Sequence, residues 1–346
     1  MAHEESKFRK PRFTRQPSVS FSQIELVRAG PLRPDDPLPL VVEPNVKDID
    51  LAGWAAANPD FIEGGLSKHG ALLLRGFDVR SLAEFEQFAQ AATARGGLFR
   101  EYGDLPPEGE SDAVYQSTPY PDDKTILFHN ESSHMHRWPM RQFFHCVTAA
   151  EEGGETPVVD CRRVHAALPA DIVERFERKG LLYVRNFTAG LDISWQDFFK
   201  TDDPARVEAY CRAAGMEYEW KPDGLRTLQR RPAVMPHPRT GEKVFFNQIQ
   251  LHHVSCLAPE VREALLSIFT PDSLPRSVYY GDGTPIPDEV VDEITETYWR
   301  ESVAYRWQAG DILMVDNLIV AHARNPFKGK RKIVVAMGDM RSVAEL

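Results

Sequence analysis

The sequence predicts a domain built mainly of antiparallel β-strands that carries helical insertions. Short apolar runs typical of strands occur both early and late in the chain, and the segments with helical periodicity lie between them. Strands and helices therefore do not alternate in the regular order of a parallel α/β sheet. The sequence also contains no glycine-rich loop of the kind that cradles nucleotide phosphates, which argues against a nucleotide-binding fold.

The composition is that of a globular protein without nucleic-acid or membrane partners. Of the 346 residues, 42% are hydrophobic, enough for a full core, and the formal net charge is −10. An acidic chain is a poor partner for a phosphate backbone, and no run of about 18 apolar residues could span a bilayer. The first residues lack the apolar segment of a signal peptide, and four scattered cysteines suit a reducing compartment. We therefore expect a cytoplasmic protein.

Two regions are expected along the chain. Residues 1–37 are basic and then proline-rich, which predicts an extended N-terminal arm, either disordered or lying over the body. Residues 38–346 are expected to form one domain. Its clearest early strand is the apolar run 71–74, which has no polar face and is typical of a fully buried strand.

Capping signals and apolar periodicity predict five helices. Ser81 and Glu84 form a capping box at the start of the best-marked helix, whose apolar stripe ends before Gly96. The other four are expected over about 170–179, 204–215, 259–269 and 287–299. Strand-like segments are 143–148, 157–160, 181–187, 244–247, 303–307, 312–315 and 332–337.

One short motif contains the residue types of a metal site. His129 and Glu131 are separated by one residue, so in an extended segment both side chains project from the same face. An imidazole and a carboxylate supply two ligands of the two-histidine-one-carboxylate triad of non-haem Fe(II) oxygenases. Such a pair is common by chance, so the hypothesis needs a third ligand.

His322 is the candidate for that third ligand, because it closes a strongly strand-like region. A buried histidine without a function is the alternative. Arg331 follows nine residues later and precedes an apolar run. A guanidinium that enters a barrel interior needs a carboxylate partner, and a bound dicarboxylic cosubstrate would supply one.

Several motifs together resemble the TauD/TfdA family of Fe(II)/2-oxoglutarate dioxygenases, over about residues 70–340. The motifs are His129-x-Glu131, Gly154-Glu155-Thr156 and His322-x-Arg324-x-Pro326-Phe327-x-Gly329-x-Arg331. Further phrases are similar to the branch that includes syringomycin-type aspartyl hydroxylases. They lie at residues 117–121, 128–131, 237–242, 246–248 and 280–283.

This resemblance implies a double-stranded β-helix, or jelly roll, with helical insertions. It implies that His129, Glu131 and His322 bind Fe(II), and that Arg331 and Thr156 hold the distal carboxylate of 2-oxoglutarate. The implied reaction is oxidation of an aliphatic C–H by O2, with 2-oxoglutarate converted to succinate and carbon dioxide. Halogenating relatives lack the carboxylate ligand, so the presence of Glu131 favours hydroxylation or desaturation over chlorination.

The resemblance also bears on the substrate, which we expect to be an amino acid or an amino-acid derivative used in natural-product biosynthesis. Val335 stands where members acting on small sulfonates or aryloxy acids carry an arginine, which argues against such substrates. Candidate substrate contacts are Gln116, Ser117, Asn247 and Arg324, although Arg324 could instead brace the loop after the third ligand. His134 and His136 are expected at the rim of the pocket, and residues 252–253 in structural or surface positions.

Alternatives remain open for the substrate and for the function class. The amino acid could be free or tethered to a carrier protein. An acidic enzyme would need a basic patch to dock an acidic carrier. The candidate patch is Lys221, Arg226, Arg230 and Arg231, with a solvated basic loop as the alternative. A hydroxylase or desaturase of another free small molecule, and a jelly-roll protein that binds metal or ligand without turnover, are the alternative functions.

Overall fold

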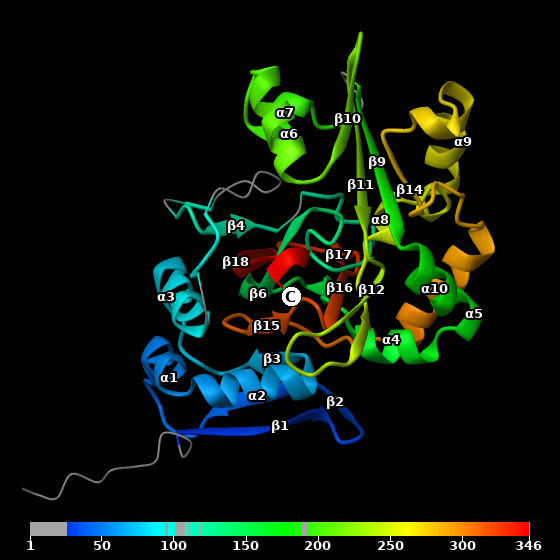
Figure 1. Ribbon diagram of the computed structural model, residues 1–346. Coiled ribbons are helices and arrows are strands. Elements are labelled where there is room, and N and C mark those ends of the chain that lie inside the picture. Colours follow the sequence, from blue (N-terminus) through cyan, green and yellow to red (C-terminus); the bar gives the residue numbers. More distant parts are fainter. Residues whose placement is uncertain are drawn as a thin grey trace, which may run out of the picture.

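Two facing β-sheets form the centre of the structure, a computed structural model that describes residues 26–93, 96–100, 108–109, 111–117, 119–188 and 192–345 (Figure 1). The larger sheet has seven strands, and every neighbouring pair is antiparallel except β2 and β3. In spatial order the strands are β1 (Val27–Arg33), β2 (Asp36–Pro44), β3 (Ala71–Leu74), β15 (Ile312–Asp316), β6 (Arg137–Thr148), β18 (Lys332–Ser342) and β4 (Val114–Gln116).

The smaller sheet has three strands and closes the jelly roll. In spatial order they are β5 (Ile126–His129), β16 (Val320–Arg324) and β8 (Val158–Asp160), and a short pair, β7 (Glu152–Gly153) and β17 (Phe327–Lys328), lies apart from them. Side chains from β5 and β16 line the same pocket as side chains from β6 and β18, so the two sheets face each other across it. The expected fold class, mainly β with helical insertions around a double-stranded β-helix, is therefore confirmed.

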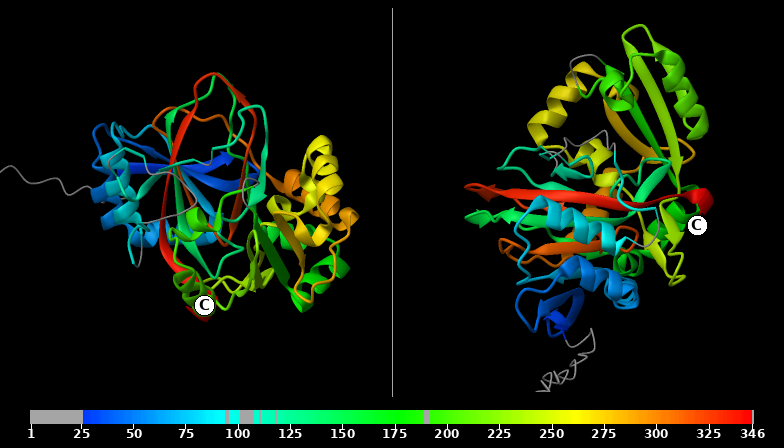
Figure 2. Two further views of the ribbon diagram at one scale, coloured as in Figure 1. Left: turned by 90° about the horizontal axis from the view of Figure 1, so that it is seen from above. Right: turned by 90° about the vertical axis from the view of Figure 1, so that its left-hand side faces the viewer.

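The apolar run 71–74 shows how the larger sheet is buried on both faces. Leu72 and Leu74 pack under the helices on the outer face, whereas Ala71 and Leu73 face the interior between the sheets. The covering helices are α1 (Leu51–Ala57), α2 (Pro59–His69) and α3 (Leu82–Ala92) (Figure 2). A strand that is covered on both sides has no polar face, as the sequence predicted.

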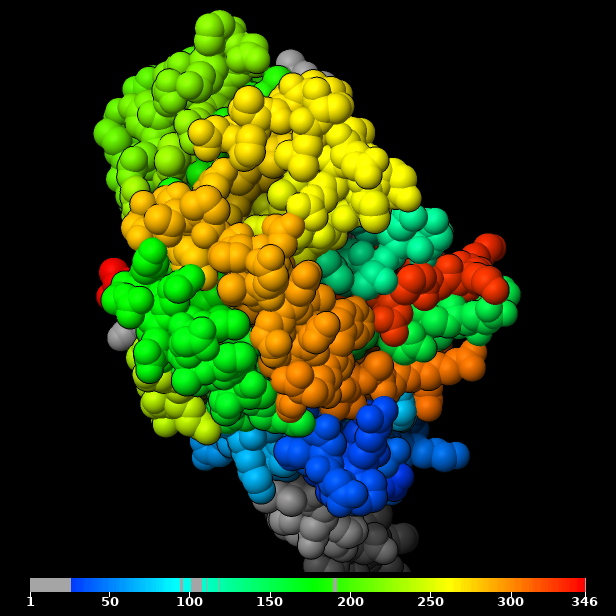
Figure 3. All heavy atoms as spheres, turned by 90° about the vertical axis from the view of Figure 1, so that its right-hand side faces the viewer, coloured from blue at the N-terminus to red at the C-terminus, as the bar shows by residue number. Residues whose placement is uncertain are grey.

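A long insertion between β8 and β15 builds a second lobe beside the jelly roll. Its main sheet has the order β10 (Glu217–Lys221), β11 (Gly224–Arg231), β9 (Leu181–Thr188) and β14 (Arg276–Tyr280), and β12 (Val234–Pro236) pairs with β13 (Lys243–Phe245). The helices of the insertion are α4 (Cys161–Ala167), α5 (Ala170–Lys179), α6 (Trp195–Phe199), α7 (Pro204–Ala213), α8 (Ile249–His252), α9 (Pro259–Ile268) and α10 (Asp288–Glu301). Figure 3 shows that α5, α9 and α10 form much of one side of the molecule.

Two expectations about the chain need correction. The boundary expected at residue 37 falls inside β2, because residues 27–33 already pair with β2 as the edge strand β1. Proline at such an edge costs no ladder hydrogen bond, so the proline-rich composition was compatible with a strand. Residues 1–25 of the expected arm lie outside the described residues. The segment 303–307 makes only an isolated bridge between Val303 and Val158, since its alternation places Tyr305 and Trp307 in the core without a strand partner.

The five predicted helices are present as α3, α5, α7, α9 and α10. None of the helices that the structure describes has both the length and the apolar character needed to cross a membrane.

The cap of α3 gives a test of the local structure. The Ser81 hydroxyl accepts a hydrogen bond from the backbone N–H of Glu84 at 3.2 Å. Ser81→Ala should therefore lower the free energy of unfolding by about 1 kcal/mol, measured by urea denaturation. Ser267→Ala, which removes an exposed hydroxyl within α9, is the control and should change it by less than about 0.5 kcal/mol. A Ser81→Ala protein as stable as the wild type would contradict this role for the cap.

Candidate metal centre and cosubstrate pocket

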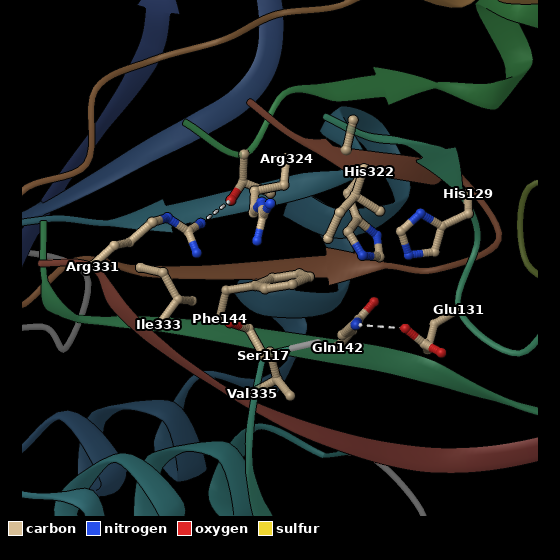
Figure 4. Close-up of a pocket in the computed structure, with 13 residues that line it drawn as sticks. Ser117, His129, Glu131, Gln142, Phe144, His322, Arg324, Arg331, Ile333 and Val335 are labelled. Atoms are coloured by element: carbon tan, nitrogen blue, oxygen red, sulfur yellow. Dashed lines mark hydrogen bonds between the residues drawn. The ribbon is translucent and has the colours of Figure 1, made fainter. Parts of the chain in front are cut away.

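The two candidate histidine ligands lie opposite each other on adjacent antiparallel strands. His129 ends β5 and is the register partner of His322 on β16, and their ring centroids are 4.3 Å apart. One donor atom from each histidine and one from Glu131 lie within 4.8 Å of one another. Figure 4 shows the three side chains at one end of the pocket. The three residues that the sequence predicts as metal ligands therefore lie close together in the structure.

Both imidazoles are suited to bind a metal ion. The Nδ1 of His129 lies 2.9 Å from the carbonyl oxygen of Leu127. A carbonyl only accepts hydrogen bonds, so Nδ1 carries the proton and the lone pair is on Nε2. Burial, with a smaller contribution from His129, lowers the pKa of His322 well below its usual value, so its ring is neutral. The buried Nδ1 of His322 has no hydrogen-bond partner among the described residues.

Glu131 reaches the site from a turn, not from a strand. Strand β5 ends at His129, and the following residues form a turn in which Ser132 has a φ of 56°. Glu131 therefore approaches His129 through this turn. The sequence predicted instead that both side chains project from one face of an extended segment. Asn317 holds the turn: its Oδ1 accepts from the Glu131 N–H at 2.8 Å, and its Nδ2 donates to the Glu131 carbonyl at 2.9 Å.

Further hydrogen bonds from side-chain amides hold the same turn. Asn317 Nδ2 also donates to the carbonyl of Pro139 at 2.8 Å, which ties the turn to the start of β6. Asn130 donates from Nδ2 to the Asn317 carbonyl at 2.8 Å. Gln248 donates to the Asn130 carbonyl at 3.0 Å. The backbone around Glu131 is therefore held by side-chain amides from two distant parts of the chain, Asn317 and Gln248, together with that of the neighbouring Asn130.

A buried carboxylate secures the strand end that carries Asn317. Asp316 accepts hydrogen bonds from His237 at 3.1 Å and from Arg141 at 3.4 Å. Burial acts to raise the pKa of Asp316, but the hydrogen bond from His237 and the charge of Arg141 outweigh it, and the pKa is lowered. Asp316 is therefore an ionised anchor. Sequence reasoning did not assign a role to any of these three residues.

Arg331 and Thr156, whose side chains have donors suited to a carboxylate, lie at the opposite end of the pocket. Arg331 lies just before β18, and its Nε donates to the Gly154 carbonyl at 2.9 Å while Nη2 lies 3.4 Å from the Thr156 hydroxyl oxygen. That oxygen also accepts from Trp307 at 3.1 Å, so the hydroxyl proton of Thr156 is free to donate elsewhere. Gly154 has a φ of 72°, and a Cβ there would lie 3.0 Å from the Cδ of Arg331, so glycine is needed at this position.

Arg331 is a partly buried cation without an acidic partner among the described residues. Burial, followed by the nearby charge of Arg324, lowers the pKa of Arg331 to about 10. Among the described residues no carboxylate forms an ion pair with it. A bound carboxylate would remove both penalties. In Figure 4 Arg331 and Glu131 lie at opposite ends of the pocket, with Phe144 between them.

Comparison with known proteins identifies this architecture. The sequence model of the family described as "Taurine catabolism dioxygenase TauD, TfdA family" matches residues 31–337. The chain belongs to the TauD/TfdA family. Members of this family are Fe(II)- and 2-oxoglutarate-dependent dioxygenases, so the enzyme class and the cofactors Fe(II), 2-oxoglutarate and O2 expected from the sequence are confirmed. The chemistry of the donor set described above fits this metal and this cosubstrate.

Two relatives of this TauD/TfdA dioxygenase come from natural-product pathways. The dapdiamide synthesis protein DdaC of Enterobacter agglomerans is 39% identical over 302 residues, which are 86% of this chain and 90% of DdaC. The tyrosine isonitrile desaturase of Pseudomonas aeruginosa is 23% identical, over 87% of this chain and 88% of that protein. The crystal structure of PvcB from Pseudomonas aeruginosa, with a TM-score of 0.55 and 16% identity, covers 92% of this chain and 93% of that one and shares its fold.

The structure places the four candidate substrate contacts of the dioxygenase in different environments. Ser117 lines the pocket, but Gln116 is exposed on the edge strand β4. Asn247 is buried outside the pocket, where Nδ2 donates to the Tyr298 hydroxyl at 3.0 Å and Oδ1 accepts from the Ile249 N–H. Gln116 and Asn247 therefore do not line the pocket.

Arg324 lines the pocket and also braces a loop. It donates to the carbonyls of Tyr120, Pro121 and Lys124 at 2.5 to 3.1 Å. Those three carbonyls occupy most of its donors, so the bracing alternative describes its observed contacts. Val335 lines the same pocket.

The expected basic docking patch forms only in part. Its four residues lie on the hairpin of β10 and β11, where successive side chains point to opposite faces. The register of β10 and β11 places Lys221, Arg226 and Arg230 on one face of the hairpin and Arg231 on the other. Arg230 is exposed and paired with Glu217, and Lys221 is paired with Glu219. Arg231 is turned inward and is only 8% exposed. Arg231 is the residue that leaves the expected patch, because neighbouring residues of a strand point to opposite faces.

Gln142 is a pocket residue that sequence reasoning missed. It lies on β6 with its Nε2 3.4 Å from a carboxylate oxygen of Glu131. The apolar strand around it gave no signal of this role, which depends on the pairing of β6 with its neighbours.

Removing the amide of Asn317 tests how the turn is held. Asn317→Ala leaves the buried N–H and carbonyl of Glu131 and the carbonyl of Pro139 without this partner. We expect the free energy of unfolding to fall by about 2–5 kcal/mol, measured by chemical denaturation. Asn325→Ala, which removes a half-buried amide bonded only to Glu155 and outside the turn, is the control and should cost about 1 kcal/mol or less. Equal losses in both variants would show that the turn is held by other contacts.

Proposed function

We propose that this dioxygenase binds Fe(II) through His129, Glu131 and His322 and 2-oxoglutarate through Arg331 and Thr156, and that it hydroxylates an aliphatic C–H of an amino acid or amino-acid derivative. One observation carries the proposal: a single pocket holds three converging metal donors at one end and, at the other, a half-buried guanidinium that has no carboxylate partner among the described residues.

The protein residues position the reactants and exclude water. The hydrogen bond to Leu127 fixes the ring of His129, and the amide of Asn317 fixes the backbone of Glu131. Arg331 and the hydroxyl proton of Thr156 would hold the distal carboxylate, which orients the 2-oxo acid end toward the metal donors. When bound, Fe(II) with O2 and 2-oxoglutarate supplies the oxidising chemistry that side chains lack, with succinate and carbon dioxide as coproducts.

Apolar side chains close the pocket between its two ends. Phe144, Ile333 and Val335 line it from the larger sheet, and the ring of Phe144 lies 4.9 Å from that of His322. A dry environment of this kind limits side reactions of an oxidising centre. The carboxylate of Glu131 leaves no ligand position for chloride, which supports hydroxylation over halogenation.

The substrate class rests on the relatives and on the pocket. The name of DdaC places that relative in dapdiamide synthesis, a natural-product pathway. Val335 offers no charge to a small sulfonate or aryloxy acid. Because Arg231 is turned inward and Lys221 and Arg230 are paired with glutamates, the hairpin offers little net positive charge to an acidic carrier. A free amino-acid substrate is therefore the first candidate, and the carrier-tethered form is the second.

A substrate screen tests the reaction class. The protein is incubated aerobically with Fe(II), ascorbate and 2-oxoglutarate, together with free amino acids or amino acids loaded on carrier proteins. We expect succinate above background and a product heavier by one oxygen atom, detected by mass spectrometry. Bound metal without succinate across the whole panel would favour the non-catalytic binding alternative.

Glu131→Ala tests the ligand set without depending on turnover. Loss of a residue behind a ligand costs about 10–100-fold in metal affinity, so loss of a direct ligand should cost more. Calorimetric titration with Mn(II) under anaerobic conditions measures this affinity. Glu289→Ala, which removes an exposed carboxylate on α10, should bind Mn(II) as the wild type does. Unchanged affinity in Glu131→Ala would remove this residue from the site.

Arg331→Ala tests the cosubstrate site. Loss of two charge-assisted hydrogen bonds should raise the concentration of 2-oxoglutarate needed for half-saturation by about 10–100-fold. Binding of 2-oxoglutarate to the Fe(II)-loaded protein in the absence of O2 gives the readout. The exposed neighbour Lys330 provides a matched control, since Lys330→Ala removes a cation of the same segment outside the pocket. An unchanged requirement in Arg331→Ala would mean that another residue holds the distal carboxylate.

A further inference from the structure

A polar band crosses a buried face of the four-stranded sheet in the second lobe. On this face Phe187 and Leu225 pack under α7 at one end, and Leu181 and Tyr280 pack in the main core at the other. Between them the register places Thr227 beside Arg185 and Gln229 beside Tyr183, with Arg231 two residues farther along β11. Thr227, Gln229 and Arg231 are each no more than 8% exposed. A buried face of this kind is expected to be apolar throughout.

The polar groups of this band are not satisfied by the protein. The Nε and Nη2 of Arg231 and the Oε1 of Gln229 are buried without a hydrogen-bond partner among the described residues. Native proteins leave few buried polar atoms unpaired, so a group of them calls for a ligand.

Arg231 differs from the other arginines that have a buried, unpaired atom in the described ranges. Arg141 and Arg185 are paired with carboxylates, and Arg324 donates to three carbonyls. Arg226, on the opposite face of β11, is only half-buried and has one such nitrogen. Arg231 has two unpaired buried nitrogens, and its guanidinium lies against the Trp138 ring, whose centroid is 5.1 Å from its Cζ. Burial lowers the pKa of Arg231 below the usual arginine value. A stacked guanidinium with its nitrogens free is suited to a planar, bidentate anion such as a carboxylate.

The band lies next to the candidate metal centre. Trp138 is on the same face of β6 as the pocket residues Gln142 and Phe144. The carbonyls of Pro139 and Glu131 both accept from the same nitrogen of Asn317, at 2.8 and 2.9 Å. The residue after Trp138 is therefore in contact with the amide that holds the proposed carboxylate ligand.

A second connection runs through Tyr183. Its hydroxyl accepts from the Gln248 N–H at 2.9 Å, and the side chain of Gln248 donates to the carbonyl of Asn130, between the two proposed ligands. The rings of His134 and His252 lie 6.0 and 5.0 Å from the ring of Tyr183. Burial lowers the pKa of His252 to about 3, so it adds no competing positive charge.

We propose that Arg231 binds a carboxylate of the substrate, and that the amide of Gln229 binds a polar group beside it. This inference rests on the proposed function and narrows the substrate to amino-acid derivatives that carry a free carboxylate. The second lobe then selects the substrate, while the jelly roll holds the metal and the cosubstrate.

Binding of four small probes tests the proposal and identifies the carboxylate. The Fe(II)- and 2-oxoglutarate-loaded protein is titrated without O2, by calorimetry, with L-aspartate, its α-amide, its β-amide and its diamide. We expect L-aspartate and one monoamide to bind and the diamide not to bind, and the monoamide that binds shows which carboxylate is recognised. Equal binding of the diamide, or no binding of any probe to the wild type, overturns the proposal.

Substitutions separate recognition from structure. Arg231→Met should weaken binding of L-aspartate by about 10-fold or more, and Arg231→Lys should weaken it less, because the charge remains and the bidentate geometry is lost. Arg230→Met is the matched control on the opposite, exposed face of the same strand and should bind as the wild type does. Unchanged binding in Arg231→Met overturns the proposal.

Thermal stability and metal loading provide independent readouts. An unpaired buried charge kept for a ligand destabilises the free protein, so Arg231→Met should have a midpoint of thermal unfolding equal to or above that of the wild type. A clear fall in the midpoint would assign Arg231 a structural role instead. Binding of Mn(II) and 2-oxoglutarate should be unchanged in Arg231→Met. If the proposed function is wrong, the wild-type protein will fail to bind Mn(II) and 2-oxoglutarate. These two measurements are separate from the probe titration.

Discussion

The hydrogen bonds of the Asn317 amide are the interaction on which the candidate site depends. One side chain satisfies both backbone groups of Glu131 and reaches the carbonyl of Pro139. The turn after β5, the start of β6 and the end of β15 are thereby fixed relative to one another. A carboxylate in a turn would otherwise sample many positions, and a metal ion requires one. The ionised Asp316, held by Arg141 and His237, keeps this amide in place.

The local features of the fold could be predicted well from the sequence, and the distant contacts could not. Ser81 caps α3 as expected, and the run 71–74 is buried on both faces, because capping and burial are written into a few neighbouring residues. The segment 303–307 has the alternation of a strand, yet its neighbour β8 is too short to pair along it. Alternation reports which side chains are buried, and the backbone partner depends on the rest of the fold.

The same distinction applies to the site. The metal donors were found because their types and motif are specific, although Glu131 converges on the histidines through a turn and not through strand alternation. Asn247 was chosen as a polar residue near a strand, and it proved to donate to the Tyr298 hydroxyl and to accept from the Ile249 N–H. Asn317, Gln142 and His237 act through partners that are distant in the sequence, so a single sequence gives no spacing by which to find them. Arg231 was placed in a surface patch, and alternation along β11 turns it inward.

The chain order of the donors has a consequence for how the enzyme matures. His129 and Glu131 precede the long insertion, whereas His322 follows it, so the three donors come from segments separated by more than half of the chain. During synthesis the first two emerge long before the third. A nascent chain therefore cannot present a complete set of donors until the second lobe has been made and β16 has paired with β5. If these three residues bind the metal ion as proposed, metal loading is a late event, and an ion that binds only the completed fold also stabilises it by mass action.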